Sequence, residues 1–253
     1  DVMHIPYSIL TDDDADFKAV IEKAAAYCRK SRQPYALIAP KGVMAASEKA
    51  NNVDAVYPMS REEAIEVILD AMPADTIYSA TTGRATRELF FLRERRNETK
   101  SHDFLNVGSM GHASSVSLGI AMEQPNRNVV CLDGDSACIM HMGAMTMVSK
   151  VNVPNFMHIV LNNGAHESVG GQPSAGHKLD FTKIAEACGY ATVGKAVESE
   201  TELIEAVNQL KHCGKASFID CRIHKGLNSK LPPIIFDHRD AIDSFIADLN
   251  GKD

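Results

Sequence analysis

The residue types best suited to chemistry lie where two apolar runs end. The triplet Gly-Asp-Ser at 134–136 directly follows the run 128–133, and Asn-Asn-Gly at 162–164 closes a run that begins at 156. A turn from a strand into a helix at 134–136 would present free backbone N–H groups and the positive end of the helix dipole, which together bind anions. We therefore expect an anion site at this turn.

A phosphate bound at this turn would need a cation beside it. No Lys or Arg lies between 128 and 149, and the carboxylate of Asp135 would repel an anion. A hard divalent ion removes the conflict because it takes carboxylate, amide and phosphate oxygens together. Asn162 and Asn163 would supply neutral oxygen ligands from the next strand end. Gly164 would relax the turn, so that a backbone carbonyl just beyond it completes the set.

Each of these features has a simpler interpretation when taken alone. Asp135 by itself would be a helix N-cap, and the two asparagines would be ordinary turn residues. Their combination at two neighbouring strand ends favours a site in which a metal ion supports an anion.

The elements that must position these residues follow from the apolar pattern. Strands are expected at 35–40, 76–80, 104–107, 128–133, 156–162, 190–194 and 217–223, and helices at 14–30, 60–72, 111–123, 135–149 and 198–211. Strands that alternate with helices, several of them continuously apolar, indicate an α/β fold with a parallel sheet covered by helices on both faces. In such sheets ligands collect beyond the carboxyl ends of the strands.

The chain is expected to divide near its N-terminus. Residues 46–59 lack an apolar period and are interpreted as a linker, and residues 60–253 as one complete domain. Residues 1–45 contain only one expected helix and one expected strand, which cannot bury a core of their own. We interpret them as the tail of a missing domain and the start of the linker.

Composition excludes several classes of partner. The net charge is -7, from 33 acidic and 26 basic residues, which argues against a general nucleic-acid surface. No apolar run approaches the roughly 18 to 20 residues that span a bilayer. The six cysteines are scattered without a CxxC pair, as in a protein with reduced thiols. We expect a cytoplasmic protein without a nucleic-acid or membrane partner.

The Gly-Asp-Ser at 134–136, followed after 25 residues by Asn162-Asn163, resembles the signature of thiamine diphosphate enzymes. In that family the diphosphate domain holds the tail of the cofactor through Mg²⁺. The resemblance implies Asp135 and Asn163 as side-chain ligands of the metal and the carbonyl of Ala165 as a third ligand. It also places the diphosphate at the turn that begins with Gly134, against the backbone amides of Ser136 and Ala137.

Two further segments resemble the same family. In "NVGSMGHASS", 106–115, the turn Gly108, Ser109 and Met110 would lie along the aminopyrimidine of the cofactor. The carbonyl of Gly108 would accept from its amino group, and Met110 would support the bent form of the cofactor. Thr82, in "SATTGRATREL" at 79–89, would contact the diphosphate.

Within this family the run "NNGAHESVGGQPS", 162–174, most resembles phosphonopyruvate decarboxylases, with sulfopyruvate decarboxylases close behind. The implied reaction is nonoxidative decarboxylation of phosphonopyruvate to phosphonoacetaldehyde and CO₂. His112 and His166 would assist protonation or bind the substrate anion, unless each is a histidine satisfied by a backbone partner. Arg84 and Arg87 would either hold the phosphonate or form a solvated helix face.

The family also needs a glutamate on a pyrimidine-binding domain, for which no segment of this chain is a candidate. We therefore expect a C-terminal portion that is inactive alone, joined by a pyrimidine-binding domain of the same or another chain, in a homo-oligomer. Two other interpretations stay open. One is a dinucleotide-binding dehydrogenase, against which the absence of a GxGxxG after any strand counts. The other is a diphosphate-domain subunit that serves only in assembly.

Overall fold

A computed structural model describes residues 3–11, 17–44, 56–151, 153–226, 231 and 237–251, in two compact units, 1–52 and 53–253. The first unit holds β1 (Tyr7–Ile9), α1 (Phe17–Ser31) and β2 (Ala36–Ile38), with β1 and β2 paired in parallel. Strand β1 was not predicted. Residues 14–16 of the predicted first helix lie outside the described residues, as does most of the predicted linker 46–59, so that linker stays a prediction.

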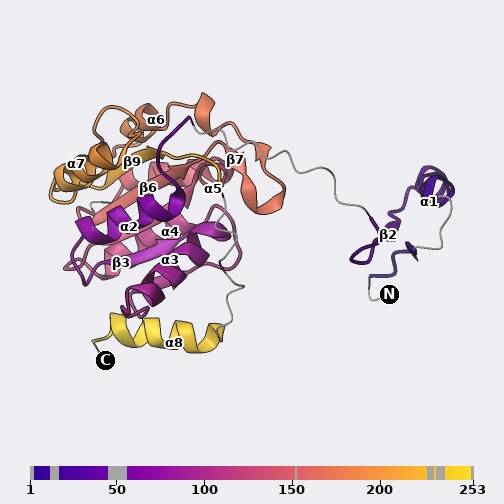
Figure 1. The fold of residues 1–253 in the computed structure, drawn as a ribbon, viewed down its shortest axis with the longest axis horizontal. Helices are drawn as coiled ribbons and strands as arrows, with labels where there is room; N and C mark the ends of the chain where they lie inside the picture. Colours follow the sequence, from indigo (N-terminus) through magenta and orange to yellow (C-terminus); the bar gives the residue numbers. More distant parts are fainter. Residues whose placement is uncertain are drawn as a thin grey trace. The chain divides into compact units, whose positions relative to one another are not determined.

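A five-stranded parallel sheet in the order β4-β3-β5-β6-β9 forms the centre of the second unit (Figure 1). Its strands are β3 (Ile77–Ala80), β4 (Asp103–Leu105), β5 (Val129–Gly134), β6 (Phe156–Asn162) and β9 (Ser217–Arg222). The predicted α/β class is confirmed, and each of these strands matches a predicted one. Strands β5 and β6 are direct neighbours, with Gly134 opposite Leu161, so the two polar strand ends meet as expected.

The predicted strand at 190–194 is wrong. Only isolated bridges form there, Ala191 to Ser217 and Val197 to Cys221, along the outer edge of β9. The hydroxyl of Thr192 accepts a hydrogen bond from the backbone of Gly194, which has a positive φ of 79°. This local turn competes with the extended pairing that a strand requires.

Helices cover both faces of the sheet. They are α2 (Arg61–Ala71), α3 (Arg84–Arg95), α4 (Ala113–Glu123), α5 (Asp135–Met140), α6 (Phe181–Ala187), α7 (Glu200–Leu210) and α8 (His238–Leu249). Apolar residues of α2, α3 and α7 form one buried cluster with one face of the sheet. Those of α4, α5, α6 and α8 form a second cluster on the other face. Because the strands are covered on both sides, they are predominantly apolar rather than alternating.

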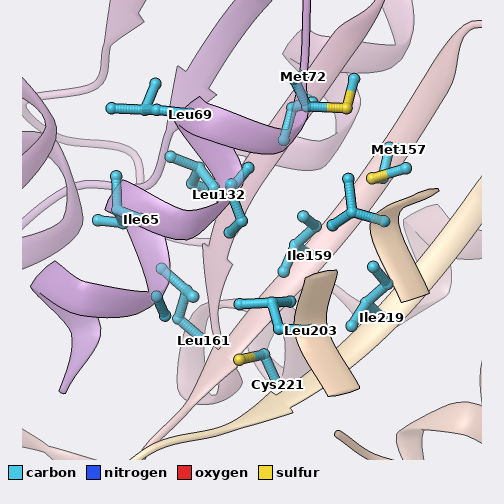
Figure 2. Packing of buried hydrophobic residues seen from close by; sticks show 14 of the residues in the cluster. Ile65, Leu69, Met72, Leu132, Met157, Ile159, Leu161, Leu203, Ile219 and Cys221 are labelled. Carbon is cyan, nitrogen blue, oxygen red and sulfur yellow. The ribbon is translucent and has the colours of Figure 1, made fainter. Parts of the chain in front are cut away.

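Figure 2 shows the first of these clusters. Ile65 and Leu69 of α2 and Leu203 of α7 pack over Leu132 and Ile159 of the adjacent strands β5 and β6. Each of these five side chains is at most 7% exposed. This packing holds β5 and β6 rigidly side by side beneath the polar residues that follow them.

Helix α2 begins at a capping box, in which Ser60 and Glu63 satisfy each other's backbone N–H groups. The predicted helix 135–149 is wrong beyond Met140, because α5 ends there and a 3₁₀ helix, Met142–Ser149, follows. Gly143 lies in this second segment, where its backbone freedom disfavours a regular α-helix. His141, expected inside the helix, instead occupies the break and is exposed.

Smaller elements complete the unit. Strands β7 (Ala165–His166) and β8 (Gln172–Pro173) pair in antiparallel fashion just after β6, and 3₁₀ turns lie at Glu167–Val169 and Gly176–Lys178. No described helix is long and apolar enough to cross a membrane.

Candidate functional site

A pocket open to solvent lies beyond the carboxyl ends of β3, β5 and β6. Such an edge is where parallel sheets collect ligands. Its lining includes most of the site residues predicted from the sequence: Thr82, Met110, Gly134, Asp135, Ser136, Ala137, Asn163, Ala165 and His166. Gly108, Ser109 and His112 do not line it, and all three are exposed.

Asp135 is the first residue of α5 and is only 3% exposed. The N-cap of α5 is Gly134, without a side-chain capping bond, so the interpretation of Asp135 as an N-cap is wrong. Burial raises the pKa of Asp135, opposed by hydrogen bonds from the Ser174 hydroxyl and the Ser136 backbone. No ion pair to Asp135 occurs within the part of the chain that the structure describes. A bound cation would compensate this buried carboxylate.

The two asparagines at the end of β6 differ in their surroundings. Asn162 is fully buried, and its amide nitrogen donates to the carbonyl of Gly176 (3.1 Å) and to Asp220 Oδ1 (2.9 Å). Asn163 lines the pocket, and its amide nitrogen donates to Glu167 Oε2 (2.6 Å). Asn162 therefore secures the strand end, while Asn163 faces the pocket.

Two buried hydroxyl groups on the pocket wall lack partners among the described residues. They are Ser136 Oγ, at the start of α5, and Thr81 Oγ1, directly after β3. Buried polar groups in proteins nearly always have a hydrogen-bond partner. A ligand rich in oxygen, held beside Asp135, would supply one to both. The donor set therefore fits a diphosphate with a hard cation.

The loop 174–177 packs closely against Asp135 and Asn162. Gly176 packs so near Asp135 and Asn162 that a Cβ atom placed there would lie 2.5 Å from Asn162 Oδ1 and 2.8 Å from Asp135 Cβ. Only glycine fits at that contact. The backbone of this loop thus fixes the orientation of the Asp135 side chain.

The turn predicted to lie along the aminopyrimidine extends from Met110 away from the pocket. Ser109 has a positive φ of 51°, which is uncommon for a residue with a side chain and is concentrated at functional sites. His112 Nδ1 lies 3.2 Å from the Ser109 carbonyl, and the His112 ring lies 4.3 Å from that of His141. His112 thus belongs to a pair of exposed histidines, apart from the pocket-lining His166.

A buried pair below the turn was not predicted from the sequence. Asp133 Oδ2 lies 3.1 Å from His158 Nε2, both side chains being fully buried, and Asp133 Oδ1 accepts from the backbone N–H of Gly134 (2.9 Å). An acid at the end of an apolar strand was the available signal. Its histidine partner on the neighbouring strand needed the register of the sheet.

A second group that was not predicted is a buried network of charges beside the pocket, of which Arg61 and Glu167 line the wall. Arg61 forms ion pairs with Glu88 (3.1 Å) and with Glu167, and these side chains are 8%, 4% and 8% exposed. Burial raises the pKa of Glu88, while Arg61 lowers it. Arg84 also lines the pocket, whereas Arg87 donates to the carbonyl of Leu231 (3.1 Å). No local sequence signal joins residues so far apart.

Residues 81–221 match the family described as thiamine pyrophosphate enzyme, C-terminal TPP binding domain. A phosphonopyruvate decarboxylase of Streptomyces viridochromogenes is 31% identical over 210 residues, covering 76% of this chain and 51% of that protein. The chain thus spans about half of its length, and 41% of a second phosphonopyruvate decarboxylase, from Streptomyces hygroscopicus.

Two other similarities bear on size and fold. The beta subunit of sulfopyruvate decarboxylase from Methanocaldococcus jannaschii is 26% identical over 196 residues, covering 73% of this chain and 96% of that subunit. Among solved structures, a thiamine diphosphate-dependent 4-hydroxybenzoylformate decarboxylase of Rhodococcus jostii RHA1 has a TM-score of 0.52 at 18% identity, covering 66% of this chain and 33% of that one. This last similarity is one of fold alone.

Proposed function

Because this chain belongs to the thiamine pyrophosphate enzymes through their C-terminal TPP-binding domain, we propose that its pocket holds the diphosphate of thiamine diphosphate through a magnesium ion. The observation that carries the proposal is the convergence of Asp135 and Asn163 from two adjacent strand ends on one pocket. Oxygen ligands of this kind suit Mg²⁺, which also binds phosphate oxygens.

Each residue at the strand ends has a distinct part in this proposal. Asp135 and Asn163 bind the metal through side-chain oxygens, and Ala165 binds it through its carbonyl. The hydroxyl of Ser136 and the first amides of α5 donate to the diphosphate, because these groups have no helical partner. The hydroxyl of Thr81, which was not among the predicted residues, joins Thr82 on the opposite wall.

The organic part of the cofactor extends past Met110 to the exposed turn of Gly108 and Ser109. That turn needs a second surface to enclose the cofactor, and a pyrimidine-binding domain supplies it in this proposal. The beta subunits of sulfopyruvate decarboxylase, by their name parts of a larger enzyme, support such a partner. The partner also carries the glutamate that activates the cofactor, and the assembly is a cytoplasmic homo-oligomer of these pairs.

The proposed reaction is nonoxidative decarboxylation of a 2-oxo acid, for which thiamine diphosphate supplies an electron sink when bound. His166, on the pocket wall, holds the substrate carboxylate or delivers a proton. Arg84 lines the same wall and offers a cation for a second anionic group of the substrate. His112 lies outside the pocket, so we assign it to the surface that meets the partner domain.

The substrate we propose is phosphonopyruvate, converted to phosphonoacetaldehyde and CO₂. Its support is the 31% identity to two phosphonopyruvate decarboxylases. Sulfopyruvate is the second candidate, because the sulfopyruvate decarboxylase beta subunits match this chain over 96% and 97% of their own lengths.

The experiment combines this chain with a pyrimidine-binding domain, thiamine diphosphate and Mg²⁺, and measures CO₂ release from phosphonopyruvate, sulfopyruvate and pyruvate. We expect the highest kcat/KM with phosphonopyruvate, and no turnover by the chain alone or by Asp135→Ala. A preference for sulfopyruvate would favour the second candidate. Equal rates with pyruvate would defeat both substrate assignments.

A further inference from the structure

The side-chain amide of Asn163 ends in a nitrogen and an oxygen, which differ chemically but exchange places when the amide rotates by half a turn. Its nitrogen only donates hydrogen bonds, and its oxygen only accepts them or binds a cation. A metal ion therefore needs the oxygen toward the pocket, and a rotation by half a turn would present the wrong atom. Some neighbouring group must select between these two orientations.

Glu167 makes that selection at the nitrogen end of the amide, and the backbone N–H of Ala165 supports it at the oxygen end. Glu167 Oε2 lies 2.6 Å from Asn163 Nδ2, and a carboxylate can only accept a hydrogen bond. The amide nitrogen must therefore face Glu167. Asn163 Oδ1, on the opposite end of the amide, accepts from the backbone N–H of Ala165 (3.1 Å) and keeps a second lone pair for another partner.

Glu167 is itself held from two sides. The guanidinium of Arg61 binds Glu167 Oε2 with one nitrogen and Glu88 Oε1 with another, at 3.1 Å. The backbone N–H of Gly226 donates to the other oxygen of Glu167, at 2.6 Å. With these partners both carboxylate oxygens have fixed positions, and the carboxylate cannot turn away from Asn163.

We propose that Glu167 and Arg61 are positioning residues that present the oxygen of Asn163, rather than its nitrogen, to the metal ion. The inference rests on the proposed function for the identity of the metal site. It assigns a task to a buried ion-pair network whose members lie outside the Gly-Asp-Ser and Asn162-Asn163 signature. Arg61 is the first residue of α2, Glu88 lies in α3 and Glu167 follows β7. The network therefore connects the segment that follows Asn163 to two helices on one face of the sheet.

Burial makes this arrangement rigid. The three charged side chains are at most 8% exposed, so water does not compete for their hydrogen bonds. Groups that orient a metal ligand in this way typically contribute 10- to 100-fold in metal affinity when they are removed. We expect an effect in that range for Glu167→Gln, because a glutamine can donate to Asn163 and so stabilise the wrong orientation.

The test measures Mn²⁺ binding to the full chain combined with a pyrimidine-binding domain, with thiamine diphosphate present, by the electron paramagnetic resonance signal of free Mn²⁺. Four proteins are compared: the unaltered chain, Glu167→Gln, Asn163→Asp and the double variant. An aspartate at position 163 offers an oxygen in either orientation and needs no selection. Glu66→Gln, at a partly exposed glutamate of α2 paired with Arg95, serves as the matched control, alone and combined with Asn163→Asp.

We expect Glu167→Gln to weaken Mn²⁺ binding by about 10- to 100-fold when Asn163 is present. When it is combined with Asn163→Asp it should not weaken binding further, and Glu66→Gln should leave binding unchanged with either residue at position 163. An equal loss with either residue would overturn the inference, because it would mean a structural effect or direct ligation by Glu167. Unchanged binding in Glu167→Gln alone would also overturn it.

Two further measurements keep the result decisive. If Glu167→Gln does not fold, as judged by circular dichroism, Arg61→Lys replaces it, because lysine cannot hold both glutamates with one planar group. Arg61→Lys must then weaken Mn²⁺ binding when Asn163 is present and must not weaken it further when combined with Asn163→Asp. Failure of the unaltered chain to bind Mn²⁺, or binding by Asp135→Ala equal to it, would refute the proposed function itself, independently of Glu167.

Discussion

Replacing Gly176 by alanine would disturb the proposed metal ligand without changing any charge or hydrogen-bonding group. The added methyl would lie 2.5 Å from Asn162 Oδ1 and 2.8 Å from Asp135 Cβ, with Asp135 Oδ2 nearer still. These separations fall roughly 1 Å short of the distance at which heavy atoms attract each other. Asp135 or the loop must therefore move, whereas a metal site tolerates displacements of about 0.2 Å.

The magnitude follows from this overlap. Overpacking of a close contact costs about 1 to 3 kcal/mol of folding free energy. We further expect at least tenfold weaker binding of thiamine diphosphate with Mg²⁺, because the ligand can no longer keep its position. A tenfold loss removes about 1.4 kcal/mol of the stabilisation by ligand at a saturating concentration. For a domain of this size that corresponds to roughly 3 to 6 °C in Tm.

The assay is thermal unfolding of the full chain with and without thiamine diphosphate and Mg²⁺. Gly119→Ala is the matched control, since nothing lies within 4 Å of a Cβ at that helical position. It should raise stability by about 0.5 to 1 kcal/mol and keep the full increment from the cofactor. A cofactor-dependent rise in Tm for Gly176→Ala equal to that of the unaltered chain would show that the contact of Gly176 does not hold Asp135 in place.

Four other substitutions test separate features of the fold and the site. Burial raises the pKa of Asp248, but hydrogen bonds from Arg127 and His102 lower it by more, so the pKa of Asp248 is lowered overall. These ion pairs therefore stabilise the fold at neutral pH, and their stabilisation is lost as the pH falls through the pKa of Asp248 in the folded protein. Urea unfolding should therefore show a stability gap between the unaltered chain and Asp248→Asn that closes below about pH 4, and a constant gap would contradict the assigned ion pairs. Asn162→Ala should cost about 1 to 3 kcal/mol of unfolding free energy because it leaves buried acceptors without donors, whereas Asn163→Ala should chiefly abolish the effect of Mg²⁺ on Tm. The reverse pattern in calorimetry would show that their roles are exchanged. Ser60→Ala, which breaks the capping box of α2, should cost about 1 kcal/mol in chemical denaturation and leave cofactor binding unchanged.

The sequence predicted all five strands of the central sheet and the meeting of its two polar strand ends. Buried parallel strands are apolar on both faces, so the sequence identifies β5 and β6 as apolar runs. The polar residues at the end of each strand can then be identified directly. The pairing of β5 with β6 could be expected because consecutive strands commonly pair. The stretch 190–194 has the same apolar composition, but the turn at Thr192 and Gly194 prevents regular pairing there.

The parts of the site that were missed depend on contacts between distant segments. Arg61 and Glu167 are 106 residues apart, and nothing in either local sequence marks them as partners. The close approach of Gly176 to Asp135 likewise arises only when the loop after β8 folds back over α5. The pairing of Asp133 with His158 depends on the register of β5 against β6, which apolar patterns do not determine.

The role of a metal ion in the pocket is tested by the affinity for thiamine diphosphate of this chain joined by a pyrimidine-binding domain, measured by isothermal titration calorimetry with Mg²⁺ and with a chelator. We expect binding that depends on Mg²⁺ and that Asp135→Ala abolishes. Binding of equal strength in the chelator, or in the Asp135→Ala protein, would contradict a pocket that holds the diphosphate through a metal ion.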